Sequence, residues 1–325
     1  MADIARLANV SKITVSRALN DSPLVRADTK EAIRNVAREH GYRFNKAARN
    51  LRLRRHHTIA VAFDSNAHHP LTEPFPIAVI ARIAESLTNN GYDLLVCAET
   101  GTSADWGAAI AAKPVDGVIV IGSDKDGAMV DGIRRAQLPA ILCGSDHVDD
   151  AYPTLSGDNV HGGELAASRL YAVGRRDLLF LGDIDNSEER QRWEGFDETA
   201  RRLAVRSLRQ LPAGIGHGDG YEAMGRLLEG EGRCFDGLFA RNDMVAMGAV
   251  RALERAGLSV PGDVSVIGYD DIPMAAGFSP PLTTIAQDSR RTGEEIVARV
   301  LALVDGETVD SVKLPTTLVV RRSCA

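Results

Sequence analysis

The sequence predicts a chain of three parts: a small all-α head, a short hinge helix, and a core of two α/β lobes with doubly wound parallel sheets. Two short helical patterns near the amino end, interrupted at residues 9–11, predict the head. From about residue 58, short apolar runs alternate with helical stretches in two successive series, which predicts two similar lobes. With 325 residues, of which 44% are hydrophobic and 25% charged, the chain is long enough for several separate cores.

Residues 1–45 are expected to form the head, a helix-turn-helix followed by a third helix. Ser11 can cap the second helix, and Asn9 in the turn tolerates a left-handed conformation better than most residues. Arg26 stands at the expected cap of the third helix, which weakens that cap, and Gly41 can supply a left-handed cap at its end. The apolar residues expected to face the core of the head are Ile4, Leu7, Ala8, Val10, Val15, Ala18, Leu19, Ile33, Val36 and Ala37.

The second helix points five side chains away from this core: Lys12, Ile13, Thr14, Ser16 and Arg17. They include donors for phosphates and base edges, although an ordinary helical hairpin with a solvated face would look similar. Residues 1–57 hold 13 Lys and Arg against 5 Asp and Glu, a balance of +8, whereas the whole chain carries −6 and the remainder therefore −14. A basic head on an acidic body is typical of a module that binds a polyanion.

Residues 46–57, KAARNLRLRRHH, are predicted to form a hinge helix that is marginal alone, because they hold too few apolar side chains to pack a core. The core is expected over residues 58–325. Its N-lobe is predicted from about 58–157 plus 288–312, and its C-lobe from about 158–287 plus 313–325.

The core should contain buried parallel strands separated by helices. The strands are predicted at 59–63, 93–97, 117–122 and 140–144, then at 178–182, 236–240 and 264–268, with a final strand at 314–320. The helices are predicted near 77–90, 188–204, 220–230, 243–257 and 290–304. Open α/β sheets bind ligands beyond the carboxyl ends of their strands, so a ligand is expected in a cleft between the lobes.

Composition and spacing argue against several other classes of protein. The four cysteines are widely scattered without a C-x-x-C pair, so we expect incidental thiols in a reducing compartment. The paired histidines at 56–57 and 68–69 lack a nearby carboxylate or Cys at helical spacing, so neither a metal nor a cofactor beyond a small-molecule effector is expected. The sequence has no apolar stretch long enough for a signal peptide or membrane span, which makes the cytoplasm the expected location. It also lacks a glycine-rich phosphate loop and a nucleophile paired with a base, so we do not expect the protein to be an enzyme.

Three segments, in this order and spacing, resemble the lactose/galactose repressor family of bacterial transcription factors over essentially the full chain. VSKITVSRALN is similar to the recognition helix of the family, and GYRFNKAARNLR to its third-helix exit and hinge. FARNDMVAMGAVRALERAGLSVPGDVSVIGYDDIPMAAGFSPPLTTIAQD is similar to its most distinctive C-lobe block. The resemblance implies a helix-turn-helix head and a periplasmic-binding-protein-like core.

The resemblance also implies which residues contact DNA. Arg17 is the expected guanine contact, since arginine offers a bidentate fork, whereas Ile13 can offer only apolar contact. Leu51 falls where hinge helices of the family wedge a leucine into the minor groove, and Arg52 can neutralise a phosphate beside it. The alternative is that Leu51 packs on the core. The DNA-binding residues are expected to be Lys12, Ile13, Thr14, Ser16, Arg17, Asn20, Leu51 and Arg52.

Polar residues that follow strands are candidates for the ligand site. The resemblance assigns Asp270, Asn242 and Arg192 to ligand contacts and adds the loop from Asp64 to Phe75. Carboxylates accept hydrogen bonds, guanidinium donates them and asparagine does both, which suits the hydroxyls of a sugar. Alternatively, Arg192 and Asp270 form a structural ion pair between the lobes. The ligand-binding residues are expected to be Asp64, Asp158, Arg192, Tyr221, Asn242 and Asp270.

The function implied is that of a ligand-responsive transcriptional regulator. The expected form is a repressor of sugar-utilisation genes that binds palindromic double-stranded operator DNA as a homodimer and is released by a carbohydrate inducer. A corepressor mode that depends on a purine or another metabolite stays open. A plain solute-binding protein could use the same two lobes, but it would leave the basic head unexplained.

Overall fold

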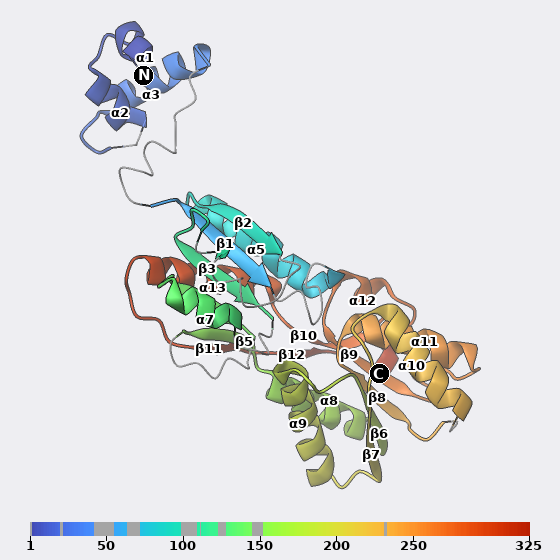
Figure 1. Ribbon diagram of the computed structural model, residues 1–325. Helices are drawn as coiled ribbons and strands as arrows, with labels where there is room; N and C mark the ends of the chain where they lie inside the picture. The colour runs from blue at the N-terminus through green and yellow to red at the C-terminus, as the bar shows by residue number, and fades with distance from the viewer. Residues whose placement is uncertain are drawn as a thin grey trace. The chain divides into compact units, whose positions relative to one another are not determined.

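The computed structural model describes residues 2–19, 22–41, 55–63, 72–98, 109–110, 112–122, 128–144, 152–230 and 233–325. The chain divides into two compact units, Met1–His56 and His57–Ala325, each of which is described by itself (Figure 1). Four of the predicted site residues, Asn20, Leu51, Arg52 and Asp64, lie outside the described residues, as does most of the predicted hinge helix.

The first unit is the predicted all-α head, built from three helices around a small apolar core. The helices are α1 (Ala2–Leu7), α2 (Lys12–Leu19) and α3 (Ala27–Glu39). The buried side chains between them are Ile4, Ala5, Val15, Ala18, Val25, Ile33 and Ala37. Leu7 was predicted to belong to this core, but it is 44% exposed because the short α1 turns Ile4 and Ala5 inward instead.

Local signals in the head behave as the sequence predicts. The backbone N–H of Thr14 donates to Ser11 Oγ at 3.1 Å, which caps α2. Asn9 adopts a left-handed conformation with φ of 52° in the turn before that cap, and Gly41 does so after α3 with φ of 61°. Arg26 precedes α3 without a side-chain cap bond. The turn and the helix ends are therefore set by short-range chemistry.

The first lobe of the second unit is a six-stranded sheet in the order β11-β5-β4-β3-β1-β2, and all neighbouring strands are parallel. Its strands are β1 (Thr58–Phe63), β2 (Asp93–Ala98), β3 (Gly117–Ile121), β4 (Ala140–Cys143), β5 (Thr154–Gly157) and β11 (Val312–Leu314). Helices α5 (Pro74–Asn89) and α13 (Ser289–Val304) share one buried cluster with the sheet. Helix α7 (Ala128–Arg135) packs in a second cluster, so helices cover both faces.

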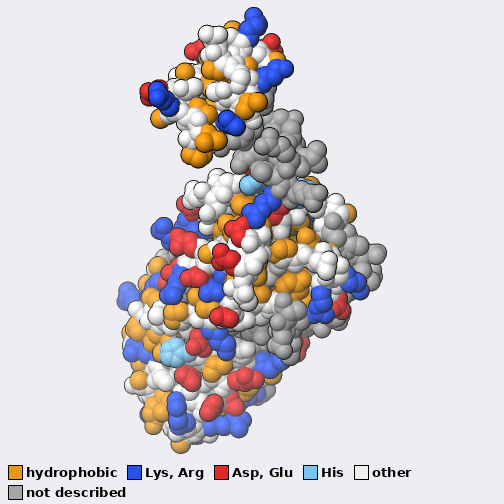
Figure 2. Space-filling model, turned by 90° about the vertical axis from the view of Figure 1, so that its left-hand side faces the viewer, with side chains coloured by type: hydrophobic (Ala, Val, Ile, Leu, Met, Phe, Trp, Pro, Cys, Tyr) orange, Lys and Arg blue, Asp and Glu red, His pale blue; other side chains and the backbone are white. Residues whose placement is uncertain are grey.

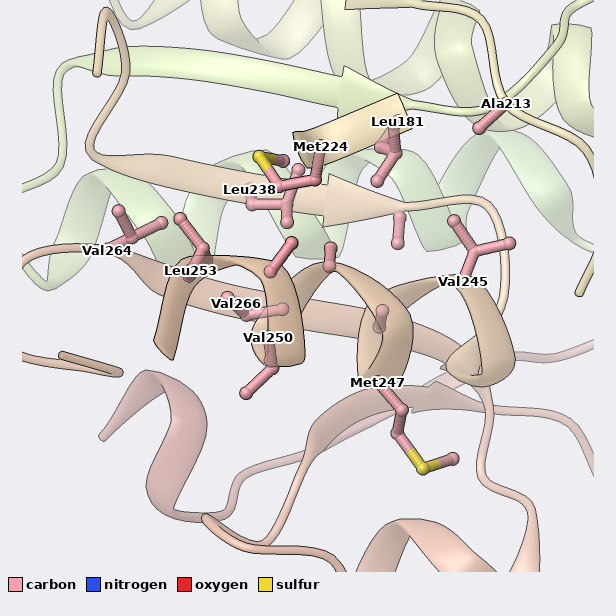
Figure 3. Close-up of a cluster of buried hydrophobic side chains, with 14 of the residues drawn as sticks. Leu181, Ala213, Met224, Leu238, Val245, Met247, Val250, Leu253, Val264 and Val266 are labelled. Carbon is pink, nitrogen blue, oxygen red and sulfur yellow. The ribbon is translucent and has the colours of Figure 1, made fainter. Parts of the chain in front are cut away.

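The second lobe repeats this plan with strand order β12-β10-β9-β8-β6-β7. Its strands are β6 (Asp177–Leu181), β7 (Ser207–Leu211), β8 (Gly237–Ala240), β9 (Ser265–Asp270), β10 (Thr283–Ala286) and β12 (Thr317–Val319), of which β12 is antiparallel to β10. The helices are α8 (Asn159–Ala172), α9 (Ser187–Arg202), α10 (His217–Gly230), α11 (Asp243–Arg255) and α12 (Pro273–Gly277), followed by a final 3-10 turn, Arg322–Cys324. Figure 3 shows side chains of α11, among them Val250 and Leu253, packed with the strand residues Leu238 and Val266.

Three segments cross between the lobes: from β5 to α8, from β10 to α13, and from β11 to β12. The single strand predicted at 314–320 is wrong, because the chain leaves the first sheet at Leu314 and enters the second at Thr317. The predicted lobe boundary at 312/313 therefore falls inside β11, and sheet membership moves it beyond Leu314. Asp158 joins two crossovers, since its N–H donates to Leu314 O at 2.8 Å and its carbonyl accepts from Thr316 Oγ1 at 3.1 Å.

The amino end of α5 contacts both lobes. Phe75 is half-buried and packs against the apolar clusters of the first and of the second lobe. This contact holds one turn of the first lobe against the second. In the parts of the chain that the structure describes, no helix is long and apolar enough to cross a membrane.

Candidate functional sites

The head presents the outward face of α2. Lys12, Ile13 and Arg17 are exposed on it, as the helical period predicts, and Ile13 is 63% exposed. Thr14 and Ser16 are half-buried, and Thr14 Oγ1 lies 2.9 Å from Ser11 Oγ. Figure 2 shows Lys and Arg side chains at the surface of this unit. The face therefore combines positive charge, hydrogen-bond donors and one apolar side chain, which are the groups that read base edges and phosphates.

In the second lobe, Arg192 is held in one orientation by three neighbours. The side chain is 5% exposed, and its Nε donates to Asn159 Oδ1 at 2.9 Å. Its Nη1 donates to the carbonyl of Arg241 at 2.6 Å, and its guanidinium carbon lies 3.7 Å from the centre of the Tyr269 ring. Tyr269 in turn donates to Asn159 Oδ1 at 3.0 Å. A guanidinium group buried in this way is a fixed hydrogen-bond donor at the edge where the carboxyl ends of the strands lie.

Asp270 ends β9 in an unusual backbone conformation. Its φ of 104° is a left-handed value that costs free energy in a residue other than glycine. Its Oδ1 accepts a 2.9 Å hydrogen bond from Gln287 Nε2, on the crossover that follows β10. Arg192 and Asp270 interact electrostatically, but both belong to the second lobe, on α9 and at the end of β9, so the predicted alternative of an ion pair between the lobes is wrong.

Asn242 lies beside this group, at the amino end of α11. It is 5% exposed, and its Oδ1 accepts from the N–H of Val245 at 2.8 Å, which caps the helix. Its Nδ2 donates to Ile215 O at 3.0 Å, in the loop after β7. Asn242 thus ties two loops together at the carboxyl ends of the strands.

Two predicted ligand residues make other contacts. Asp158 caps α8, with its Oδ1 accepting from His161 N at 3.1 Å, at the first crossover. Tyr221 lies on α10, and its hydroxyl accepts a 2.5 Å hydrogen bond from Arg255, the last residue of α11. Asn242 caps the opposite end of α11, so Tyr221 is not brought to the group around Asp270.

The structure adds charged residues that the sequence did not single out. We use the name interlobe charge cluster for Glu73, Glu188, Glu189, Arg192, Arg241 and Asp270, which act on one another electrostatically. Glu73 comes from the first lobe, directly before α5, and the other five come from the second lobe. Glu188 also raises the pKa of Cys143 in β4, after the larger effect of burial, which places Glu188 close to the first lobe.

Within the cluster, Glu189 and Arg241 form a buried ion pair, with side chains 8% and 4% exposed. The bond joins Arg241 Nη2 to Glu189 Oε1. Glu189 Oε2 and Arg241 Nε are buried without a hydrogen-bond partner among the described residues. The pair therefore keeps one acceptor and one donor unused.

Two carboxylic acids of the cluster titrate near neutral pH. Burial raises the pKa of Asp270 to about 7, against the lowering effects of Arg192 and of the hydrogen bond from Gln287. Burial also raises the pKa of Glu73 to about 7, although Arg241 lowers it. In both residues the cost of burying an ionised carboxylate outweighs the stabilising effect of the guanidinium groups.

The sequence signals for these residues were weak. Glu73 lay inside the predicted pocket loop 64–75, but nothing marked it within that loop. Glu188 and Glu189 look like ordinary acidic residues in the first turn of a helix, where they favour the helix dipole. Their part in the interlobe charge cluster depends on the first lobe, which supplies Glu73 and is distant from them in sequence.

The arrangement suits recognition of a polar ligand, because fixed acceptors and donors surround the junction of two lobes. Among the described residues, no three His, Cys, Asp or Glu side chains come together so as to hold a metal ion. A separate hollow of about 470 Å³ lies between the end of α9 and β7, and none of the predicted ligand residues lines it. The charged walls of that hollow are paired, as in the 2.8 Å bond from Arg201 Nε to Asp197.

A helix-turn-helix head with an exposed basic helix, joined to a two-lobed core with a charged junction, defines the class of DNA-binding regulators that carry a ligand-binding core. Residues 1–45 match the profile described as "Bacterial regulatory proteins, lacI family", and residues 167–324 match "Periplasmic binding protein-like domain". The chain belongs to the lacI family of bacterial regulatory proteins.

Curated relatives of similar length are transcriptional regulators. The chain is 30% identical to the HTH-type transcriptional regulator CelR of Thermobifida fusca, over 98% of this chain and 96% of that protein. It is also 30% identical to the transcriptional repressor PurR of Haemophilus influenzae, over 91% of this chain and 88% of the repressor.

Solved structures show the same architecture. A lac repressor dimer bound to operator and the anti-inducer ONPF superposes with a TM-score of 0.83 at 28% identity, over 99% of this chain and 98% of that one. A complex of the regulator CelR with cellobiose gives a TM-score of 0.75 at 28% identity, over 98% of each chain. A LacI family regulator from Enterococcus faecium with bound ribose gives 0.73 at 27% identity, over 82% of this chain and 98% of that one.

Proposed function

We propose that the chain is a sugar-responsive transcriptional repressor that binds a palindromic operator as a homodimer and releases it when a carbohydrate binds between the lobes. The interlobe charge cluster carries this proposal, because it sets fixed donors and acceptors at the junction of the two lobes. Relatives solved with cellobiose, with ribose, and as an operator-bound dimer support it.

The proposed ligand contacts are Arg192, Asp270 and Asn242. Arg192 donates, Asp270 accepts, and Asn242 holds the adjoining loop in place. Asp158 stays a prediction, as does Asp64, which lies outside the described residues, and Tyr221 is left out because its hydroxyl is bound at the far end of α11. A ligand that bridges both lobes favours one lobe orientation, since only three crossovers join them.

The proposed DNA contacts are the outward side chains of α2. Arg17 is assigned to a guanine, and Lys12 and Ile13 to the bases that distinguish one operator from another. Thr14, Ser16, Asn20, Leu51 and Arg52 complete the set that the family resemblance implies. A hinge helix over 46–57 that is marginal alone would transmit the lobe movement by losing its fold.

The test compares operator binding by the full chain and by the variant Arg192→Lys. A palindromic operator is first selected from random-sequence DNA, and its affinity is measured by fluorescence anisotropy against a panel of mono- and disaccharides. At least one sugar should weaken operator binding. Arg192→Lys should bind the operator normally yet need roughly tenfold more of that sugar, because lysine cannot keep the forked contacts of the guanidinium.

The control is Arg201→Lys on the same helix, whose side chain is 76% exposed. Its sugar response should equal that of the parent. A corepressor mode is the second candidate, because the PurR relatives are as similar as CelR in sequence identity. Operator binding that no sugar changes and that a purine tightens would replace the inducer proposal by that mode.

A further inference from the structure

With all of its carboxyl groups ionised, the interlobe charge cluster holds more negative than positive charge. Its four carboxylates are Glu73, Glu188, Glu189 and Asp270, and its two guanidinium groups are Arg192 and Arg241. Both guanidinium groups are already engaged: Arg192 bonds to Asn159 and to a carbonyl, and Arg241 bonds to Glu189. Each guanidinium group therefore interacts electrostatically with more than one carboxylate.

Buried carboxylates need partners that supply positive charge or hydrogen-bond donors. Glu189 is 6% exposed, and its Oε2 has no hydrogen-bond partner within the described part of the chain. Its ion-pair partner Arg241 keeps an unused Nε–H, but Oε2 makes no hydrogen bond to it, so this acceptor is open to a donor from a ligand.

Glu73 reaches the same junction from the other lobe. It precedes α5, but its side chain makes no cap bond to that helix. Two residues later, Phe75 packs against the apolar clusters of both lobes, which keeps this turn against the second lobe. Glu189 and Arg241 are among the groups that act on the Glu73 carboxyl. A donor placed between Glu73 and Glu189 would thus touch both lobes.

We propose that the effector carries a protonated amino group, as an amino sugar does, and that Glu73 of the first lobe and Glu189 of the second hold it. The inference rests on the proposed function, which assigns the effector to this junction. An ammonium group donates up to three hydrogen bonds and supplies the missing positive charge. A phosphorylated or carboxylated sugar would add negative charge to the same carboxylates and is disfavoured.

The experiment uses matched sets of probes with the full chain. Glucose, galactose and mannose are each compared with the 2-amino sugar, the N-acetylated amino sugar and the 6-phosphate of the same series. Operator release is followed by fluorescence anisotropy, and direct binding by the shift in melting temperature. In the series that acts, the amine should be effective at a concentration roughly tenfold lower than its neutral parent.

The variant Glu73→Gln tests the assigned carboxylate. It should abolish the preference for the amine, so that the amine and its neutral parent sugar act at similar concentrations. Glu85→Gln is the matched control on α5, because the Glu85 side chain is 62% exposed and paired with Arg82, and it should keep the full preference. A Glu73→Gln variant that weakens amine and parent sugar equally would assign Glu73 a structural role and overturn the inference.

The outcomes separate the two proposals. If neutral sugars or sugar phosphates release the operator as well as the amines do, the repressor function stands and the cationic effector is wrong. If no probe in any series changes operator affinity or melting temperature, the sugar response itself fails, and the inference fails with it. A preference for the amine that Glu73→Gln removes supports both.

Discussion

At the residue scale, the ligand site depends on neighbours that the sequence does not reveal. Sequence position marks Asp270 as a polar residue after a strand, but its raised pKa comes from burial and from charges on other elements. Arg192 is likewise fixed by Asn159 and Tyr269, which lie 33 and 77 positions away in the chain. The residue type decides which charges and hydrogen bonds a side chain can offer, and the fold decides its pKa and its orientation.

The raised pKa of Asp270 predicts how stability changes with pH. The folded protein keeps the proton on Asp270 up to about pH 7, whereas the unfolded chain loses it near the ordinary value of 3.8. The folded state therefore binds more protons in this range, and the free energy of unfolding falls as pH rises through it. Asp270→Asn removes this loss, so the stability of the variant relative to the parent should rise by about 1 kcal/mol or more between pH 5 and pH 8.

Urea unfolding at pH 5, 6.5 and 8 measures this difference. Glu85→Gln is again the control, since its exposed carboxylate should give a difference that does not change with pH. A constant difference for Asp270→Asn would show that this carboxyl is ionised in the folded protein throughout the range.

At the scale of elements, the strongly apolar strands were predictable and the polar ones were not. Strands β1 and β3 are continuous apolar runs, as expected of strands buried on both faces. Strand β7, SLRQL, is a half-buried edge strand with no such run, and α8 contains an internal Gly162-Gly163 pair that interrupts a helical pattern. Neither element was predicted, because pairing at the edge and close helix packing are what stabilise them.

Those glycines let α8 and α9 approach closely. A Cβ atom at Gly163 would lie 2.1 Å from the carbonyl oxygen of Arg192 and 2.6 Å from the N of Phe196. Gly163→Ala must therefore push α9 away and displace Arg192. We expect a loss of about 2–4 kcal/mol in the free energy of unfolding, as for overpacked buried sites, together with a weakened effector response.

Gly225→Ala on α10 is the matched control, because a Cβ there meets nothing within 4 Å. It should leave stability unchanged or raise it by up to about 1 kcal/mol, since alanine favours helix. Denaturant unfolding and the effector titration distinguish the two variants. Equal stability of both would contradict the close packing of α8 on α9.

At the scale of the whole molecule, charge is divided between the head and the rest of the chain. Residues 1–57 carry +8 and the remainder −14, so the net charge of −6 would by itself predict repulsion from DNA. The head unit nevertheless presents Lys12 and Arg17 on its exposed helix. Association with DNA should therefore depend on the local charge of the head and not on the total.

Operator affinity should consequently fall steeply with salt. The logarithm of the affinity is expected to fall linearly with the logarithm of salt concentration, by about 0.9 for each phosphate neutralised. Lys12→Gln removes one positive charge from the exposed helix and should make that slope shallower by up to about one for each head. Arg226→Gln, at a side chain of the second lobe that is 72% exposed, should leave the slope unchanged. A slope near zero on the selected operator would contradict binding by the basic head.

The sequence alone determined the all-α head, the two α/β series, the caps and turn of the head, and the family, because these depend on local periodicity, turn chemistry and motif order. It also placed Arg192, Asn242 and Asp270 near one sheet edge. Only the tertiary structure brought Glu73 of one lobe to Glu188 and Glu189 of the other, separated the last strand into β11 and β12, and turned Tyr221 toward Arg255. The reason is physical: electrostatic and packing interactions act between atoms that are close in space, and the crossovers make neighbours of residues that are far apart in the chain.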